Sequence, residues 1–422
     1  MSALREAARV LRHREYRWLW AGQSTSAIGD SLVIVALALF VTDRTGSATD
    51  LGVVLAASAT PLIAFLLLGG VWADRLPRHI VVITTDLTCA TLHTLLAILI
   101  FTGEITIWQL VVIEALFGSA EAFFRPAVSG LVPQTVPESD IQQANALMGV
   151  SRNVTTFLGP ALATTLVLTV GAGWAFAIDA GTFLVSAACL SRVRPRRRSV
   201  IETRDRDEPL RRSVRAELRE GYLEVRARAW IWVTLVAFAV VNVAGVAPLF
   251  VLGPLVARAQ YGHAAVFGVR MALLGIGTIA GSVIGFGWRP RYPMRMAVLL
   301  ILAWPPSLIL FGAGVTLFVM LPVAVLGGMG LALFDVWWST ALAERVPPDR
   351  LSRVTSYDWV VSAGLLPAGF VIAGPLGSWL GAVPVLIGGA AIALLATVAA
   401  LIPRETRMLE SAGGPLPQAG VP

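Results

Sequence analysis

The sequence contains no lysine, and only 14% of its 422 residues carry a charge. Soluble globular domains carry about 25% charged residues, so this composition excludes an ordinary soluble protein. Hydrophobic residues make up 56% of the chain, and the mean hydropathy is +0.75. The sequence therefore indicates an integral membrane protein.

Residues that ligate metals or carry out nucleophilic catalysis are also scarce. The two cysteines, Cys89 and Cys189, both lie within apolar runs, so the sequence offers no disulfide framework and no zinc ligand set. The four histidines are scattered along the chain, and no nucleophile elbow or phosphate-binding loop is present. We expect no metal site and no cofactor, and a membrane enzyme is the least favoured class of function.

Long apolar runs dominate the chain. A bilayer-spanning helix needs about 20 apolar residues, whereas barrel strands alternate over about 10 residues. Backbone polar groups must be paired inside lipid, so runs of this length predict helices. We therefore expect an all-α integral membrane protein with twelve transmembrane helices. The predicted spans are 17–41, 50–73, 79–102, 107–126, 141–168, 172–191, 230–256, 264–287, 295–312, 314–342, 351–376 and 380–402.

The arginines are distributed unevenly among the predicted loops. They concentrate in every second loop between predicted spans. The loops in between hold only two arginines, Arg44 and Arg258. Positive residues favour the cytoplasmic side, so this pattern predicts a multi-pass protein of the inner (cytoplasmic) membrane with both termini in the cytoplasm. The basic charge is expected to contact anionic lipid and no nucleic acid.

The longest interior segment without apolar character divides the predicted spans into six and six. Two stretches, FFRPAVSGLVPQTVP and LFDVWWSTALAERVP, resemble each other and occupy matching positions in the two halves. This layout is typical of secondary transporters, which bind substrate near mid-membrane between two pseudo-symmetric six-helix bundles. The expected organisation is an interfacial segment 1–16, bundles 17–191 and 230–402, a linker 192–229 with an amphipathic helix, and a cytoplasmic tail 403–422.

One short charged loop carries a family resemblance. The stretch GGVWADRLPRH resembles the signature loop of the major facilitator superfamily, and Gly70, Asp74, Arg75 and Arg78 match that signature. The stretches WLWAGQSTSAIGDSLVIVAL and EAFFRPAVSGLVPQTVPESDIQQANAL resemble the branch of macrolide-efflux and siderophore-exporter drug–proton antiporters. The resemblance implies a monomer that exports a hydrophobic or amphiphilic small molecule, drug-, macrolide- or siderophore-like, using a proton gradient.

A second motif supports the same branch, and two other functions stay open. Gly149 and the pair Gly159-Pro160 resemble part of the antiporter signature of superfamily exporters. This partial match disfavours an uptake carrier of the same fold, which is the main alternative. ATP-driven transport is disfavoured because no nucleotide-binding domain is recognisable.

Ionisable side chains within the apolar runs are candidates for function, because a charge inside hydrocarbon costs several kcal/mol unless it is paired or hydrated. Asp30 is the first choice for a coupling or substrate-facing carboxylate, and Glu114 and Asp179 are alternatives. Each carboxylate has a structural interpretation as well, a hydrogen bond to a neighbouring Ser or Thr. Arg152 needs a partner, for which we predict Asp30 or Glu114, and Asn145 shares its helix face.

Arg270 and three tryptophans are further large side chains in the apolar runs that we interpret. Arg270 is expected to reach the interface by snorkelling. Trp337, Trp338 and Trp359 either line a cavity for a bulky apolar substrate or lie at the membrane interface.

A further charged set lies near the expected cytoplasmic side. The resemblance implies that it closes the two halves on the inside, and the alternative is a surface loop that orients charge. Asp74 is expected to face the N-terminus of helix eleven near Ser352. Arg75 or Arg78 is expected to reach Glu121, which also has Arg125 four residues later on its own helix. The set comprises Gly70, Asp74, Arg75, Arg78, Asp86 and Glu121.

Overall fold

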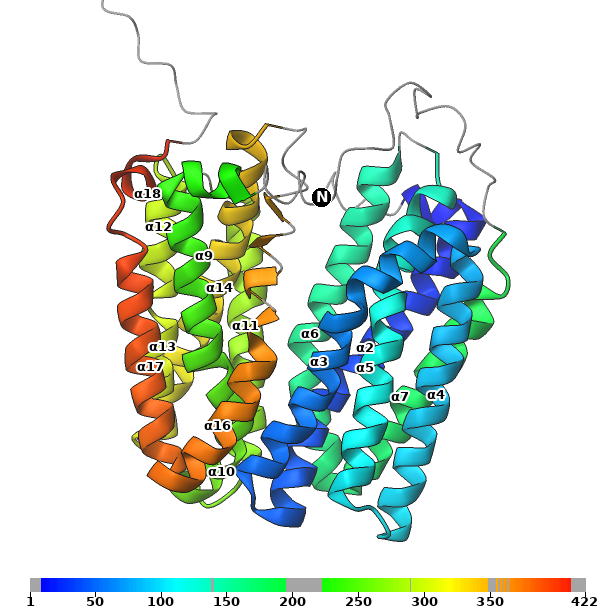
Figure 1. Cartoon of the computed structure of the whole chain (residues 1–422), viewed down its shortest axis with the longest axis horizontal. Coiled ribbons are helices and arrows are strands. Elements are labelled where there is room, and N and C mark those ends of the chain that lie inside the picture. The colour runs from blue at the N-terminus through cyan, green and yellow to red at the C-terminus, as the bar shows by residue number, and fades with distance from the viewer. Residues whose placement is uncertain are drawn as a thin grey trace, which may run out of the picture. The chain divides into compact units, whose positions relative to one another are not determined.

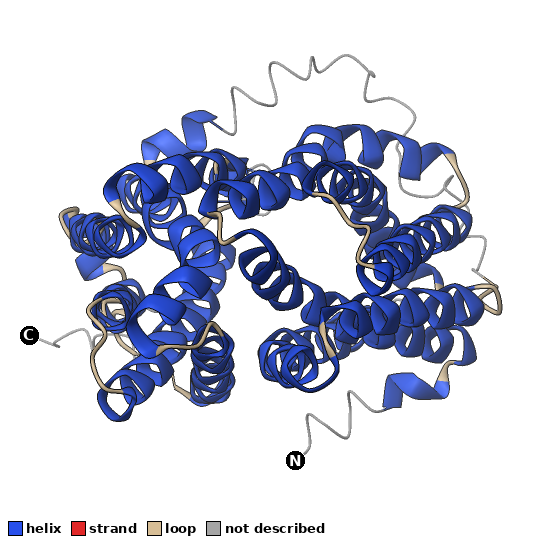
Figure 2. Ribbon diagram, turned by 90° about the horizontal axis from the view of Figure 1, so that it is seen from below, coloured by secondary structure: helices blue, strands red, loops and turns tan. Residues whose placement is uncertain are grey.

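The computed structural model describes residues 9–137, 140–194, 222–288, 290–347 and 354–410, except residues 356, 359 and 363. Within these ranges the backbone of 67–75 is described without its side chains, as is that of a few other helical positions. All regular structure in the described ranges is helical (Figures 1 and 2).

The first half of the chain forms six long helices with short connections. A 3-10 turn precedes the first of these helices, and short turns connect each helix to the next. The elements are η1 Val10–Arg12, α2 Arg14–Thr45, α3 Ala48–Arg75, α4 Arg78–Thr102, α5 Ile107–Leu131, η2 Val132–Gln134, α6 Ile141–Val170 and α7 Ala172–Leu190.

The second half contains more interruptions. One π-helical turn, η4, joins α9 to α10, and two residues separate α12 from α13, which has Pro305 in its first turn. The elements are α9 Ala229–Val241, η4 Asn242–Val246, α10 Ala247–Tyr261, α11 Ala265–Gly287, α12 Pro293–Ile301, α13 Trp304–Gly312, α14 Leu317–Arg345, α16 Leu366–Leu380, α17 Ala382–Ala399 and α18 Arg404–Met408.

The predicted spans correspond to these helices. Among the described residues, 11 helical stretches are long and apolar enough to cross a membrane. The fifth predicted run lies in α6, where the described residues include the shorter apolar stretch Leu158–Val170. The prediction of an all-α membrane protein is therefore confirmed, and the helices agree with twelve spans.

Local sequence signals set several helix ends. Gly46 and Gly103 end α2 and α4 with φ of 64° and 75°, a left-handed conformation that glycine adopts without steric cost. At the start of α5, the Thr106 N–H donates to Gln109 Oε1 at 2.8 Å within a capping box. These signals explain why α2 and α4 stop, and α5 starts, at turns of a few residues.

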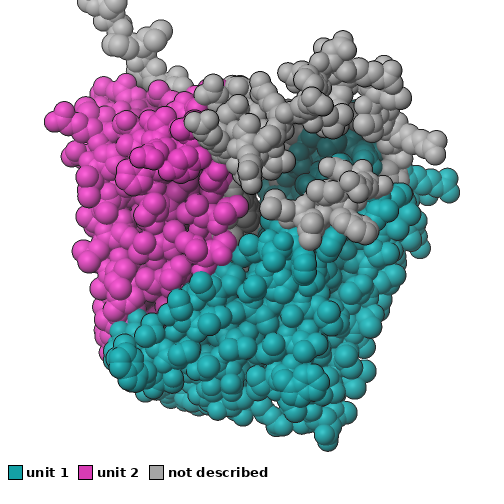
Figure 3. Space-filling view, in the orientation of Figure 1, with its two compact units in different colours: residues 1–209, 250–272, 366–385 teal, residues 210–249, 273–365, 386–422 magenta. Residues whose placement is uncertain are grey.

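The chain divides into two compact units, coloured separately in Figure 3. In the first unit, α2 packs against α6 and α7, α3 packs against α5 and α16, and α4 packs against α5 and α7. In the second unit, α12 and α13 pack against α14. The first unit comprises residues 1–209, 250–272 and 366–385, and the second comprises 210–249, 273–365 and 386–422.

Small residues allow the helices of the first unit to approach closely. A Cβ atom at Gly118 of α5 would collide with the backbone carbonyl of Ser58 on α3. A Cβ atom at Gly159 of α6 would collide with Ser31 on α2. Membrane helices use small residues for such backbone approaches, because van der Waals packing drives their association in lipid.

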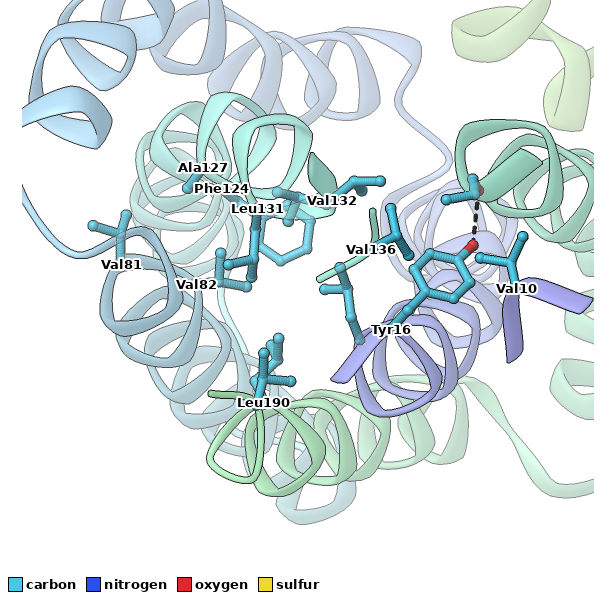
Figure 4. Close-up of a cluster of buried hydrophobic side chains, with 14 residues drawn as sticks. Val10, Tyr16, Val81, Val82, Phe124, Ala127, Leu131, Val132, Val136 and Leu190 are labelled. Atoms are coloured by element: carbon cyan, nitrogen blue, oxygen red, sulfur yellow. Dashed lines mark hydrogen bonds between the residues drawn. The ribbon is translucent and has the colours of Figure 1, made fainter. Parts of the chain in front are cut away.

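A hydrophobic cluster closes one end of the first bundle (Figure 4). Val10 and Tyr16 are buried in it, beside Leu131 of α5 and Leu190 of α7. The Tyr16 hydroxyl donates a hydrogen bond of 2.7 Å to the backbone oxygen of Ala144. The described part of the expected interfacial segment 1–16 is therefore packed against helices at this end of the bundle.

Replacing Tyr16 with phenylalanine tests this end of the bundle. We expect the free energy of unfolding to fall by about 1 kcal/mol, because one buried hydrogen bond is lost without a change in ring packing. Thermal unfolding in detergent measures the effect. Tyr222→Phe is the control, because the Tyr222 side chain is exposed. Equal unfolding midpoints for the two variants would contradict the expectation.

Candidate functional site

A small polar cavity in the first unit brings together two of the predicted residues, Asp30 and Arg152. Its volume is about 50 Å³, which is enough to hold water. The cavity thus suits a hydrated carboxylate, and the side chains of both Asp30 and Arg152 are exposed. It is lined by Gln23, Ser24, Ser26, Ala27, Asp30, Phe124, Met148, Ser151 and Arg152.

The helical repeat of α2 builds one wall of this cavity. Gln23, Ala27 and Asp30 are spaced three or four residues apart, so they lie on one face of the helix. One turn before Gln23, the Trp20 indole N–H donates to the Ser151 hydroxyl on α6 at 2.9 Å. This hydrogen bond holds α2 and α6 together beside the cavity.

The expected ion pair of Arg152 is not formed. Among the described residues, no ion pair joins Arg152 to Asp30 or Glu114, and the Arg152 side chain is exposed. The prediction was wrong because it assumed a guanidinium buried in apolar surroundings, whereas this one borders open space. Asn145, expected on the same helix face, is exposed as well.

A buried histidine–aspartate pair lies in the same unit, and the sequence interpretation missed it. His93 Nδ1 of α4 and Asp179 Oδ2 of α7 form a hydrogen bond, and both side chains are 0% exposed. His93 had been set aside because the histidines are scattered along the chain. A usable signal existed, since His93 and Asp179 lie at similar distances from the outer ends of their predicted spans.

Aromatic rings enclose His93. Its imidazole stacks on Phe117 with ring centroids 4.3 Å apart, and Phe176 and Phe183 meet it edge-on at 5.6 and 6.1 Å. Nδ1 is thereby directed toward Asp179, while Nε2 is buried without a hydrogen-bond partner among the described residues. The rings fix the orientation of the imidazole.

Two further carboxylates are buried in this unit. Glu114 of α5 is 2% exposed and has a side-chain hydrogen bond with Ser58 of α3. Asp86 of α4 is 0% exposed, and neither of its carboxylate oxygens has a hydrogen-bond partner among the described residues. For Glu114 the observed partner matches the structural interpretation, a hydrogen bond to a nearby serine.

Comparison with known proteins identifies the family. The model of the Major Facilitator Superfamily matches residues 19–364. The chain belongs to this superfamily. It is therefore a multi-pass membrane transporter of small molecules and not an enzyme, as the sequence predicted.

Individual superfamily members resemble the chain over most of its length. Macrolide efflux protein A of Streptococcus pyogenes is 25% identical over 405 residues, covering 93% of this chain and 96% of the relative. Multidrug efflux pump Tap of Mycolicibacterium fortuitum is 23% identical over 410 residues, with the same coverage. The crystal structure of nucleoside transporter NupG shares the fold, with a TM-score of 0.70, 12% identity, and coverage of 91% and 98%.

The superfamily signature loop joins α3 to α4. Gly70, Asp74 and Arg75 lie at the end of α3, and their side chains lie outside the described part of the structure, as does Ser352. Arg78 begins α4, and its Nη1 donates to the backbone oxygen of Gly130 on α5 at 2.7 Å. This bond ties the loop to the end of α5.

Glu121 and Arg125 form the ion pair that their spacing on α5 predicts. Arg125 Nε lies 3.5 Å from Glu121 Oε2, and the Arg125 side chain is 51% exposed. Water reaches the pair on the Arg125 side, whereas the Glu121 side chain is only 13% exposed. The roles of Asp86, Glu121 and the signature loop in closing the transporter stay predictions.

The residues that resemble the antiporter signature lie on α6. Pro160 sits inside the helix without ending it. Gly159 is buried against Ser31 of α2, whereas a Cβ atom at Gly149 would meet no atom within 4 Å. Gly159 of the signature therefore lies where α6 approaches α2 closely. The contact on α2 is Ser31, the residue that follows Asp30.

Arg270, Trp337 and Trp338 are buried. Arg270 of α11 is 0% exposed, so the snorkelling interpretation was wrong. Trp337 donates to the backbone oxygen of Trp288 at 3.3 Å, and Trp338 donates to Asp358 Oδ2 at 3.0 Å. Both tryptophans are packed inside the second unit, and Trp359 lies outside the described residues.

Proposed function

We propose that this transporter exports a hydrophobic or amphiphilic small molecule across the cytoplasmic membrane by proton-coupled alternating access. It acts as a monomer with both termini in the cytoplasm and takes its energy from a proton gradient. Export is supported by the full-length similarity to proteins named for macrolide and multidrug efflux. Macrolides are the first substrates to test.

The observation that carries proton coupling is the environment of Asp30. This carboxylate lies midway along a membrane helix and lines a polar cavity that water can enter, with an arginine on the cavity wall. Burial and dehydration favour the protonated carboxyl, whereas water or a nearby guanidinium favours the carboxylate. Alternating access changes this balance, so one group can bind a proton on one side and release it on the other.

The alternative is uptake by the same fold. The structural similarity to a nucleoside transporter supports the architecture alone, because the two sequences are only 12% identical. Export is favoured because the similarity to efflux proteins extends over 93% of the chain.

Transport in proteoliposomes tests the proposal. The purified protein is reconstituted, a pH gradient is imposed, and movement of a radiolabelled macrolide is followed with and without a protonophore. We expect movement against the direction of proton flow that stops when the protonophore collapses the gradient. Transport that survives the protonophore but requires ATP would contradict proton coupling.

Direction is tested in cells. We expect cells that produce the protein to accumulate less labelled macrolide and to tolerate more of it than cells without the protein. Higher accumulation in the producing cells would favour uptake instead.

A further inference from the structure

A groove in the second unit is formed by the start of α12 and the segment that follows α17. Helix α18 packs against α12 at this place (Figure 1). The groove has a volume of about 560 Å³, within the range of about 300–1,000 Å³ that is usual for small-molecule sites. Three arginines and three apolar side chains make up most of its wall: Arg295, Arg404 and Arg407, with Leu299, Leu401 and Met408.

The helical repeat directs these side chains to the groove. On α12, Arg295 and Leu299 are four residues apart and exposed, so they share one face of the helix. On α18, Arg404 and Arg407 are three residues apart and exposed, whereas Thr406 between them is buried. Two elements that are about a hundred residues apart in the chain thus bring their guanidinium groups to one groove.

Among the described residues, the three arginines of the groove have no acidic partner, and no carboxylate lines the groove. The acids that neighbour α18 in sequence are engaged elsewhere. Glu405 accepts a hydrogen bond of 3.3 Å from the Trp230 backbone N–H, and Glu410 pairs with Arg291 at 3.0 Å. The groove therefore concentrates positive charge, which favours binding of an anion.

The depth of the groove indicates that this anion is a lipid. Arg295 lies in the first turn of the apolar stretch Pro293–Gly312, and Leu401 follows the apolar stretch Ala382–Ala399 by two residues. Side chains at the ends of membrane spans lie where lipid headgroups meet acyl chains. Leu299, one helical turn deeper than Arg295, is 42% exposed and offers an apolar contact to an acyl chain.

We propose that this groove binds an anionic phospholipid. Arg295, Arg404 and Arg407 hold its phosphate, because the planar guanidinium fork matches the geometry of phosphate oxygens. The acyl chains begin against Leu299 and Leu401. Since its ligands come from two elements, the bound lipid ties α18 to α12. The site does not depend on which substrate is transported or on how transport is driven.

Lipid titration of the full-length protein tests the site. The protein is purified in detergent and titrated with phosphatidylglycerol, and the bound fraction is measured by native mass spectrometry. Two probes are titrated in parallel: phosphatidylcholine, which has the same phosphate but no net charge, and soluble glycerol phosphate, which has no acyl chains. We expect phosphatidylglycerol to bind about tenfold or more tightly than either probe.

Variants of the protein locate the site. One basic residue near a membrane surface contributes about fivefold to the affinity for anionic lipid, so loss of three is expected to weaken phosphatidylglycerol binding about a hundredfold. The groove variant combines Arg295→Gln, Arg404→Gln and Arg407→Gln. The control combines Arg12→Gln, Arg14→Gln and Arg17→Gln, which remove the same charge from exposed positions of the first unit. The control is expected to bind phosphatidylglycerol as tightly as the wild type.

Folding of both variants is expected to survive, because all six side chains are exposed, and size-exclusion chromatography verifies it. Equal affinities of the wild type for phosphatidylglycerol and phosphatidylcholine would overturn an anionic site. Glycerol phosphate binding as tightly as phosphatidylglycerol would overturn the assignment to a lipid. An equal loss of affinity in the two variants would show that binding follows the total charge of the protein, and would overturn the groove as its location.

Discussion

Replacing Gly118 with valine is expected to prevent most of the protein from reaching its folded state. At this position α5 meets the backbone of α3, and a Cβ atom would lie 2.8 Å from the Ser58 carbonyl carbon and 3.1 Å from its Cα atom. Neither atom can move without shifting the whole of α3. Overpacking typically costs 1–3 kcal/mol and occasionally more, so we expect a loss of about 3 kcal/mol of unfolding free energy.

The same contact positions a buried carboxylate. Glu114 lies one helical turn before Gly118 and interacts with Ser58. Separating α3 from α5 would therefore break this hydrogen bond as well as the helix packing, and leave the carboxyl buried without its partner. Both effects lower the free energy of unfolding.

Fluorescence-detected size-exclusion chromatography of a fusion protein measures the folded fraction, and thermal unfolding in detergent measures the stability of what remains. Gly181→Val is the matched control, because it introduces the same side chain into α7 at a site with no heavy atom within 4 Å. If both variants give the wild-type yield and midpoint, the close contact between α3 and α5 does not govern folding.

Replacing Asp30 with asparagine is expected to reduce macrolide movement driven by a pH gradient to the level of empty liposomes. Asparagine has nearly the size of aspartate and fits the same cavity, but its amide cannot bind and release a proton in the physiological range. Folding is expected to survive, since the Asp30 side chain lines open space instead of packing in the core.

Asp43→Asn is the control for this experiment. Asp43 lies on the same helix, but at its end, where its exposed carboxylate pairs with Arg258. The substitution is chemically identical and is expected to leave gradient-driven transport unchanged. Wild-type transport by Asp30→Asn would remove Asp30 from the coupling role.

The sequence predicted the helices well because the bilayer leaves few choices for an apolar run. It predicted the interruptions less well. The seventh run continues from α9 to α10 through a π turn, and the ninth divides into α12 and α13 just before Pro305. Such local departures depend on side-chain packing, which hydropathy along the chain does not record.

The candidate site was predicted only in part. Counting residues from the ends of a span gives the depth of a side chain, and this placed Asp30 and Arg152 at levels where one cavity now joins them. Depth does not say which helix faces meet. For that reason the expected ion pair of Arg152 was wrong, and the contact between His93 and Asp179 was missed.

The length of α2 has a consequence for the surrounding lipid. Its 32 residues extend about 48 Å at 1.5 Å per residue, whereas the hydrocarbon core is about 30 Å thick. The helix therefore crosses both headgroup layers as well as the acyl chains. Lipids with longer or shorter chains change how far α2 tilts from the membrane normal, and the helix remains long enough to cross in either case.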